Sequence, residues 1–389
     1  MSPLRFSLRR RRVAWIAAVV AAAGAAFYVG LQFTPTSWRP LSWPIGTPAA
    51  EGTSPAGSPA STSPGGSDSP SSGPSKSPRA SRSPRPSHSP GHGRKPAPPK
   101  TAAQELIPAT GAYLGAFVQP RSYSSSGLIA AVNSFERTVH GQIDLVHVYH
   151  PWTEPFPDGA DRHWVSSGKV LLLTWSGTPD TLKIIAGKYD ALIRARAEAV
   201  KRLGKPILME FRHEMDRPNL QWAVHGPRDF IKAWDRIRAI FSQVGATNVA
   251  WVWCPTGYGF AHNRAQPFYP GNNQVDFVCA DVYSFSASES LARAAAPFLH
   301  WAARTGKPVI IGEFAVKSSP AAWASWLLAA GRLAENNRQI KAIAYFDANG
   351  TDSNGHPFHY WLGESQSAIA SFARLLTWQF YRPAMPAGL

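Results

Sequence analysis

The 389-residue sequence contains only two cysteines, Cys254 and Cys279. Two cysteines cannot support a small fold held together by disulfides, and their spacing does not match that of a structural zinc site. The sequence also lacks a cluster of His and carboxylate residues with metal-ligand spacing, so we expect neither a metal nor an organic cofactor. Stability must therefore come from a hydrophobic core.

Acidic residues are also scarce, with 24 Asp and Glu against 40 Lys and Arg, which gives a net charge of +16. The excess is spread unevenly: residues 1–35 carry +5, residues 36–104 carry +6, and the remaining residues carry +5. Most of the excess thus lies outside the aromatic-rich part of the chain, which shows no nucleic-acid-binding module. We therefore expect no nucleic-acid partner.

Residues 1–35 combine a basic cluster with an uncharged apolar run. Arg9 to Arg12 precede Val13–Phe33, which is long enough to cross a bilayer as a helix. The basic flank should stay in the cytoplasm, so the rest of the chain would lie outside the cell. We expect a transmembrane signal anchor at the cell membrane. A cleaved signal peptide remains the alternative, because Ala21–Ala26 offers a site for a peptidase, and the protein would then be secreted.

Residues 36–104 are dominated by Pro, Ser and Gly. Such a segment cannot bury enough apolar surface to offset its chain entropy, so it is predicted to be a disordered, fairly extended linker. Residues 105–389 are instead rich in Trp, Phe and Tyr and are long enough to bury one large core. The sequence therefore predicts three parts, namely an anchor, a linker and a globular domain.

Apolar runs of strand length recur through the globular part, and most of them are followed by a helical pattern. The eight runs are Gly111–Val118, Asp144–Tyr149, Lys169–Trp175, Pro206–Phe211, Asn248–Trp253, Asp276–Tyr283, Pro308–Phe314 and Lys341–Asp347. Most are almost continuously apolar, as expected of parallel strands covered on both faces. The helical patterns include Pro227–Val244, Ser288–Arg304, Ala321–Leu333 and Ser367–Phe380.

Eight strand–helix units in one domain predict an α/β fold of the (β/α)8 (TIM) barrel type. The rival is an open, doubly wound sheet. No Gly-rich phosphate-binding fingerprint follows the first run, which weakens the dinucleotide-binding form of that rival.

Two glutamates lie where the fourth and seventh predicted strands end. Glu214 follows the fourth run, and Glu313 ends the seventh. Catalytic groups of such barrels sit at the carboxyl ends of strands, so the two should face each other across the barrel mouth. Retaining hydrolysis of a glycosidic bond requires such a pair, roughly 5–5.5 Å apart. We expect Arg212 to lie near the pair and to favour the ionised form of the carboxylate that it contacts.

Further polar and aromatic residues fall at other strand ends. Aromatic faces stack on sugar rings, while His and Asp side chains hydrogen-bond sugar hydroxyls. Together they indicate a saccharide cleft, for which the candidates are His150, Trp175, Asp281, Tyr283 and Trp361.

The chain resembles glycoside hydrolase family 26, a family of retaining (β/α)8 barrels. The resemblance rests on Phe211–Met215, Asp281–Tyr283 and Pro308–Phe314. It implies that Glu214 is the acid/base and Glu313 the nucleophile. It further implies that Tyr283 hydrogen-bonds the nucleophile and that His213 lies in the subsite of the reacting sugar, with His150 and Trp361 as further substrate contacts.

The sequence departs from the family pattern directly after Glu214. Mannanases of the family continue His-Glu-Met with Asn-Gly and an aromatic residue, whereas here Asp216, Arg217 and Pro218 follow. The resemblance implies a retaining endo-β-glycanase that acts on a β-linked polysaccharide, with β-1,4-mannan as the leading substrate. Mixed-linkage β-glucan and β-1,3-xylan are alternatives within the family. A non-catalytic, tethered carbohydrate-binding or envelope-assembly protein is the alternative of another class, although such a protein would not need both glutamates.

The two cysteines fall on neighbouring strands of the predicted barrel. Cys254 comes just after the fifth run and Cys279 lies in the sixth. Export would permit a bridge between them, but we expect two buried free thiols.

The N-terminal prediction can be tested by cell fractionation. If Val13–Phe33 stays uncleaved, the protein should fractionate with membranes, and mild proteolysis should release the globular domain from the exposed Pro/Ser linker. A mature N-terminus within residues 22–40 on secreted protein would rule out the anchor.

Overall fold

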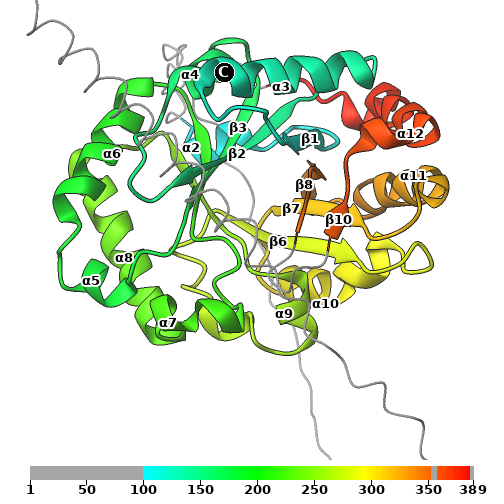
Figure 1. Cartoon of the computed structure of the whole chain (residues 1–389). Helices are drawn as coiled ribbons and strands as arrows, with labels where there is room; N and C mark the ends of the chain where they lie inside the picture. The colour runs from blue at the N-terminus through cyan, green and yellow to red at the C-terminus, as the bar shows by residue number, and fades with distance from the viewer. Residues whose placement is uncertain (1–99, 352–356, 386–389) are drawn as a thin grey trace, which may run out of the picture. The chain divides into compact units, whose positions relative to one another are not determined.

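The structure is a computed structural model that describes residues 100–351 and 357–385. In these residues eight parallel strands close into a barrel in the order β1 to β8. Figure 1 shows the strands at the centre, with helices around them. The strands are β1 (Tyr113–Val118), β2 (Leu145–Pro151), β3 (Val170–Ser176), β4 (Ile207–Phe211), β5 (Val249–Trp253), β6 (Phe277–Ser284), β7 (Val309–Val316) and β8 (Ile340–Asp347). The predicted (β/α)8 barrel is confirmed.

The helices, apart from the first one, which precedes β1, connect the strands or follow β8 and cover the outside of the barrel (Figure 1). They are α2 (Ala102–Leu106), α3 (Ser125–Thr138), α4 (Gly159–Ser166), α5 (Thr181–Ile185), α6 (Asp190–Leu203), α7 (Gln221–Val224), α8 (Pro227–Val244), α9 (Gly257–Ala261), α10 (Leu291–Ala303), α11 (Pro320–Asn336) and α12 (Gln366–Thr377). Four 3-10 turns lie at Pro218–Leu220, Gln266–Phe268, Leu362–Glu364 and Gln379–Tyr381, and a hairpin of β9 (Asn349–Thr351) and β10 (Pro357–His359) follows β8.

The predicted anchor and nearly all of the predicted linker lie outside the described residues. Within residues 100–351 and 357–385, no helix combines the length and the apolar character that crossing a membrane requires. Helix α2 begins at Ala102, three residues before the predicted start of the globular part, and its Leu106 is fully buried.

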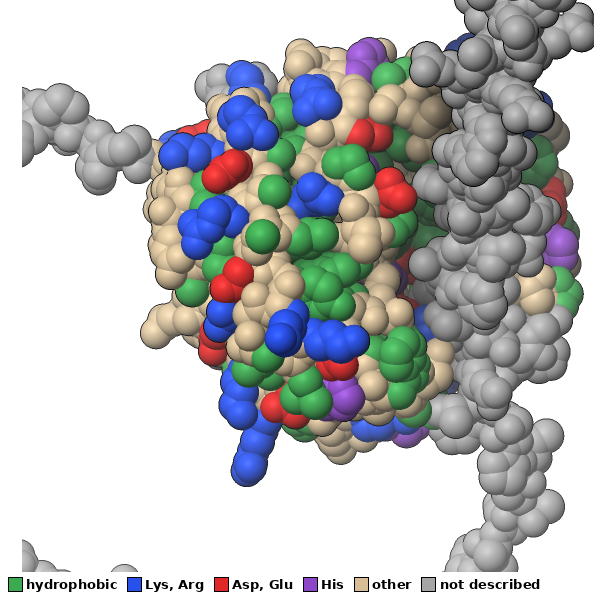
Figure 2. Space-filling view, turned by 60° about the vertical axis from the view of Figure 1, so that its left-hand side comes forward, with side chains coloured by type: hydrophobic (Ala, Val, Ile, Leu, Met, Phe, Trp, Pro, Cys, Tyr) green, Lys and Arg blue, Asp and Glu red, His purple; other side chains and the backbone are tan. Residues whose placement is uncertain are grey.

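Helix α8 shows how the sequence fixes an element of the outer layer. Pro227 occupies its first turn, where a missing N–H costs nothing, and Gly245 ends it with a left-handed φ of 76°. Phe230, Trp234 and Ile237 recur at helical spacing and are buried against the barrel. Basic and acidic side chains occupy the outward faces of α6 and α8 (Figure 2).

The interior of the barrel changes from apolar to polar along the strand direction. At the amino ends of the strands, Leu145, Val170 and Leu208 form an apolar cluster that Leu106 of α2 joins. Further along β2 and β4, the residues two places on that also point inward are His147 and Glu210, both buried. The apolar cluster therefore closes one end of the barrel and leaves a polar interior toward the other.

The two cysteines form a disulfide across β5 and β6, with an S–S distance of 2.14 Å, so the prediction of free thiols was wrong. Trp253 pairs with Val278 in the ladder, which puts Cys254 and Cys279 opposite each other at the next position. Their Cα atoms are 4.3 Å apart. A separation of 25 residues along the chain carried no information about this strand register.

Strand β7 contains an irregularity at Gly312 and Glu313. The pairing with β8 shifts register between Ile311 and Phe314, as in a β-bulge. A Cβ atom on Gly312 would lie 2.7 Å from both Asp281 Oδ1 and Cys279 Sγ, so this residue faces the barrel interior. The bulge lets the next residue, Glu313, also point inward, where a regular strand would turn it toward the helices.

Candidate active site

Glu214 lies in the turn that follows β4. Its backbone has a φ of 53°, in the left-handed region, and its N–H donates to the carbonyl of Cys254 at 2.7 Å. The side chain is buried, and Oε2 forms an ion pair with Nη1 of Arg217 at 2.8 Å. Among the described residues Oε1 has no hydrogen-bond partner. One carboxyl oxygen is therefore held, and the other is available to a ligand.

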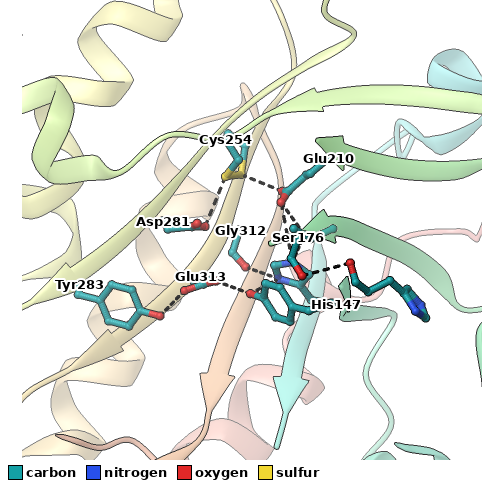
Figure 3. Close-up of polar contacts among 12 residues, drawn as sticks. His147, Ser176, Glu210, Cys254, Asp281, Tyr283, Gly312 and Glu313 are labelled. Carbon is teal, nitrogen blue, oxygen red and sulfur yellow. Dashed lines mark hydrogen bonds and ion pairs between the residues drawn. A yellow bond between two sulfur atoms is a disulfide. The ribbon is translucent and has the colours of Figure 1, made fainter. Parts of the chain in front are cut away.

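Glu313 is held by two tyrosines from opposite sides of the barrel. The hydroxyl of Tyr149 on β2 donates to Oε1, and that of Tyr283 on β6 donates to Oε2 (Figure 3). The contact of Tyr283 with Glu313 is the one that the resemblance implies. Tyr149 was missed, although it closes the second predicted strand and shares an inward face with His147.

The two carboxyls differ in their electrostatic surroundings. Burial raises the pKa of Glu214 to about 8; the charge of Glu313 also raises it, and Arg217 opposes both effects. Burial raises the pKa of Glu313 to about 7, against the lowering effect of the two tyrosine hydroxyls and of Arg217. Two buried carboxyls whose charges interact titrate as a coupled pair. The hydroxyls that stabilise the ionised form belong to Glu313, so Glu214 keeps its proton to higher pH.

His213 and Asp281 lie beside and beneath this pair. The His213 ring meets Tyr149 edge-on, with ring centroids 5.3 Å apart, and burial lowers its pKa to about 3, so the ring is neutral. Asp281 is buried with its Oδ1 3.4 Å from Cys254 Sγ, and burial together with the charge of Glu313 raises its pKa well above the usual value.

Three predicted substrate contacts point away from the barrel interior. Trp175 is fully buried and stacks on Trp152 at 4.0 Å, because its neighbours Thr174 and Ser176 take the inward positions of β3. A completely buried indole cannot stack on a sugar, so this prediction is corrected.

The His150 ring lies on the helix side of β2 and pairs with Asp161 of α4 at 2.9 Å. Arg212 is buried, and its Nη2 donates to the carbonyl of Pro179. The cation beside Glu214 is therefore Arg217, whose role the prediction had given to Arg212. Arg217 takes the place predicted for Arg212 because the backbone is left-handed at Arg212 and Glu214. This conformation reverses the side-chain directions that strand alternation would suggest.

Large aromatic side chains remain exposed on loops that follow the carboxyl ends of strands. Trp361, predicted from the sequence, is 51% exposed in the segment after β10. Trp222 on α7 and Phe285 after β6 are 67% and 59% exposed and were not predicted, because nothing in the loop sequences marks them as surface residues. Exposed aromatic rings of this kind are suitable for stacking on sugars.

Within the part of the chain that the structure describes, two groups of side chains each bring three possible metal ligands within 4.8 Å of one another. In the first, Glu210 faces Cys254 and Cys279, whose sulfurs are joined in the disulfide and are not thiolates. In the second, Asp158 caps α4 by accepting from Ala160 N, and Asp161 pairs with His150. The side chains of both groups thus have structural roles in the fold.

Comparison with known proteins finds a family that the chain resembles. The sequence model of glycosyl hydrolase family 26 matches residues 171–297, which contain β4, Glu214 and Tyr283. The chain is similar to this family over these residues. It is 28% identical over 305 residues to Endoglucanase H of Acetivibrio thermocellus. That match covers 72% of this chain but only 31% of the relative, so the chain spans about a third of the relative's length.

Solved structures of two mannanases share the fold. A β-mannanase from a symbiotic protist of the termite Reticulitermes speratus gives a TM-score of 0.53 at 12% identity, covering 74% of this chain and 98% of that one. A modular endo-β-1,4-mannanase from Cellulomonas fimi gives 0.53 at 14% identity, covering 74% and 79%. At such low identity these likenesses establish the barrel and carry no information about the substrate.

The environment of the pair predicts a pH profile. With Glu313 ionised above about pH 7 and Glu214 protonated below about pH 8, kcat/KM for an aryl glycoside should be bell-shaped with its maximum between these values. The charge of Arg217 lowers the pKa of both groups, so Arg217→Gln should move both limbs to higher pH. Lys232→Gln is the control, because Lys232 pairs with Asp229 on the exposed face of α8. Limbs that stay in place in the Arg217 variant would contradict this account.

Proposed function

We propose that the protein is a retaining glycoside hydrolase in which Glu313 is the nucleophile and Glu214 the acid/base. The observation that supports this assignment is the difference between the partners of the two carboxyls. Two tyrosine hydroxyls hold both oxygens of Glu313, which suits a group that must be ionised and fixed in direction. Glu214 keeps one oxygen without a partner among the described residues, as a proton donor to a bound substrate requires.

The first step forms a bond between a Glu313 oxygen and the anomeric carbon, while Glu214 gives its proton to the departing glycosidic oxygen. The charge of Glu313 helps to keep Glu214 protonated before this step. Once Glu313 becomes an ester, that charge is gone and Arg217 remains at 2.8 Å. The pKa of Glu214 should then fall, and its carboxylate can accept a proton from the water that cleaves the ester.

For the substrate we propose a β-linked polysaccharide cleaved in endo fashion, with β-1,4-mannan as the leading candidate. The relative with 28% identity is named an endoglucanase, an enzyme that cleaves a β-linked polysaccharide internally, which supports this class. The loop after Glu214 is built differently from the mannanase pattern: Asp216 accepts from Thr256 N and Oγ1, and Arg217 binds Glu214. Mixed-linkage β-glucan and β-1,3-xylan therefore remain alternatives.

We propose that hydrolysis takes place outside the cell, either at the membrane or after secretion. The support is the sequence of residues 1–35, with Arg9 to Arg12 before the apolar run Val13–Phe33. The partners would be the polysaccharide and, through this segment, the membrane.

A polysaccharide panel tests the substrate. We expect the purified chain to release reducing ends from β-1,4-mannan faster than from mixed-linkage β-glucan or β-1,3-xylan, and Trp361→Ala to raise KM with little change in stability, because the Trp361 side chain is half-exposed. No release from any of the three would remove the substrate class. Tight binding without release would favour the non-catalytic carbohydrate-binding or envelope-assembly protein.

Azide rescue tests the roles of the two glutamates. In Glu214→Ala, an aryl glycoside with a good leaving group should still form the glycosyl-enzyme, which then persists because water lacks its general base. Azide needs no base, so it should restore turnover and give the β-glycosyl azide. In Glu313→Ala no glycosyl-enzyme forms, and azide should displace the aglycone directly to give the α-azide.

The stereochemistry of the two azides is read by NMR. An α-azide from the Glu214 variant together with a β-azide from the Glu313 variant would reverse the assignment. Parental activity in both variants would place the catalytic groups elsewhere.

A further inference from the structure

A hydrogen-bonded chain of buried side chains crosses the barrel beneath Glu313 (Figure 3). The Nδ1 atom of His147 on β2 lies 3.0 Å from the carbonyl oxygen of Gly312 on β7. Its Nε2 lies 2.7 Å from Oγ1 of Thr174 on β3, and that hydroxyl lies 2.6 Å from Oε2 of Glu210 on β4. Four strands are joined, and the last link is the carbonyl of the residue that precedes Glu313.

The chemistry of the groups fixes the direction of the bonds. A carbonyl only accepts, so Nδ1 of His147 carries the hydrogen bonded to Gly312. Burial lowers the pKa of His147 to about 3, so the ring is neutral and Nε2 is an acceptor. The single hydrogen of the Thr174 hydroxyl must then be donated to Nε2. Oγ1 is left as an acceptor toward Glu210, whose carboxyl must supply the remaining hydrogen.

The second oxygen of Glu210 supports the same protonation state. Its Oε1 faces Sγ of Cys279 at 3.7 Å, and a sulfur in a disulfide has no hydrogen to donate. An ionised Glu210 would thus have one oxygen without a hydrogen-bond donor from that side, in a fully buried position. Burial and the charges of Glu313 and Glu214 raise its pKa to about 8, although a donated Thr174 hydrogen would oppose this.

The groups that face Glu210 come from every neighbouring strand. They are Thr174, His147, Tyr149, the Cys254–Cys279 disulfide, Asp281, Glu313 and Glu214. Of these, His147 is the only possible cation, with Nε2 4.0 Å from Oε2 of Glu210. Moving one proton along the chain would create a buried ion pair of His147 and Glu210 with the same hydrogen bonds, at the cost of desolvating two charges.

We propose that Glu210 is a positioning residue which, as a protonated acid, acts through Thr174 and His147 to fix the Gly312–Glu313 peptide and thereby the attacking oxygen of Glu313. Glu210 touches neither nucleophile oxygen; both of those accept from tyrosines. The bulge at Gly312 interrupts the ladder with β8, while on the other side β6 pairs Asp281 with Glu313. The contact with His147 therefore holds the Gly312 carbonyl where the ladder with β8 does not. This inference rests on the proposed function, in which Glu313 must attack along one direction.

The test compares matched pairs of variants of the full-length chain. Thr174→Val removes the hydroxyl at constant shape, and Thr174→Ser restores it. Glu210→Met removes the donor, whereas Glu210→Gln keeps a neutral N–H donor. With an aryl glycoside, Thr174→Val and Glu210→Met should lower kcat by about tenfold or more with KM little changed, because a small displacement of a reacting group is costly. Thr174→Ser and Glu210→Gln should stay within about threefold of the parent.

The pH profile separates positioning from a charge effect. Below its pKa of about 8 Glu210 is neutral and contributes no charge, so Glu210→Gln should leave the acid limb in place. If Glu210 were ionised, its removal would lower the pKa of Glu313 and Glu214 and move the acid limb to lower pH. That shift would overturn the proposal, as would parental kcat in a folded Thr174→Val variant. Thermal unfolding of each variant shows which of them are folded. If Glu210→Met does not fold, the kcat of Thr174→Val decides whether the proposal holds.

Infrared spectroscopy gives a result that does not depend on turnover. The difference between the parent and Glu210→Gln at neutral pH should show the loss of a protonated carboxylic acid band. Loss of a carboxylate band instead would overturn the proposal. If the parent hydrolyses no glycoside, the proposed function fails, while the infrared difference still decides the protonation state of Glu210.

Discussion

The structure depends on the burial of several carboxyl groups inside a closed barrel. Glu210, Glu214, Asp281 and Glu313 are each at most 3% exposed, and the charge of Glu313 raises the pKa of each of the other three. Burying charge without a partner is costly, so such groups either stay protonated or receive hydrogen bonds and cations. The arrangement of donors around the barrel therefore decides which carboxyl is ionised.

The donors are distributed unequally over these groups. Glu313 receives two tyrosine hydroxyls, and Glu214 receives the guanidinium of Arg217 on one oxygen. Asp281 lies against the disulfide, and its Oδ2 has no hydrogen-bond partner among the described residues. The result is one carboxyl prepared for ionisation, one poised between its two forms, and two whose pKa is raised by burial and by their charged neighbours. Acid–base chemistry on one scaffold needs such a separation of pKa values.

The scaffold makes this arrangement possible through local departures from regular strands. The bulge in β7 turns Glu313 inward beside Gly312, and the left-handed backbone at Glu214 returns that side chain into the barrel after β4 has ended. Asp216 connects the same turn to the loop after β5, because its Oδ2 accepts a hydrogen bond from the hydroxyl of Thr256. Gly259 must lack a side chain there, because a Cβ atom would lie 1.7 Å from Asp216 Oδ2. The apolar cluster at the other end of the barrel supports these irregular segments.

Sequence alone determined the barrel, the strand positions to within a few residues, and the two glutamates, because each depends on local signals. Continuous apolar runs specify buried parallel strands, and a carboxylate directly after such a run lies at the barrel mouth. The sequence did not decide which neighbours these glutamates have. The directions of Trp175 and Arg212, the cation at Glu214 and the Cys254–Cys279 bond depend on strand register and on positive φ angles. Those features arise only when eight strands close on one another, since a shift of one residue turns a side chain from the barrel interior to the helices.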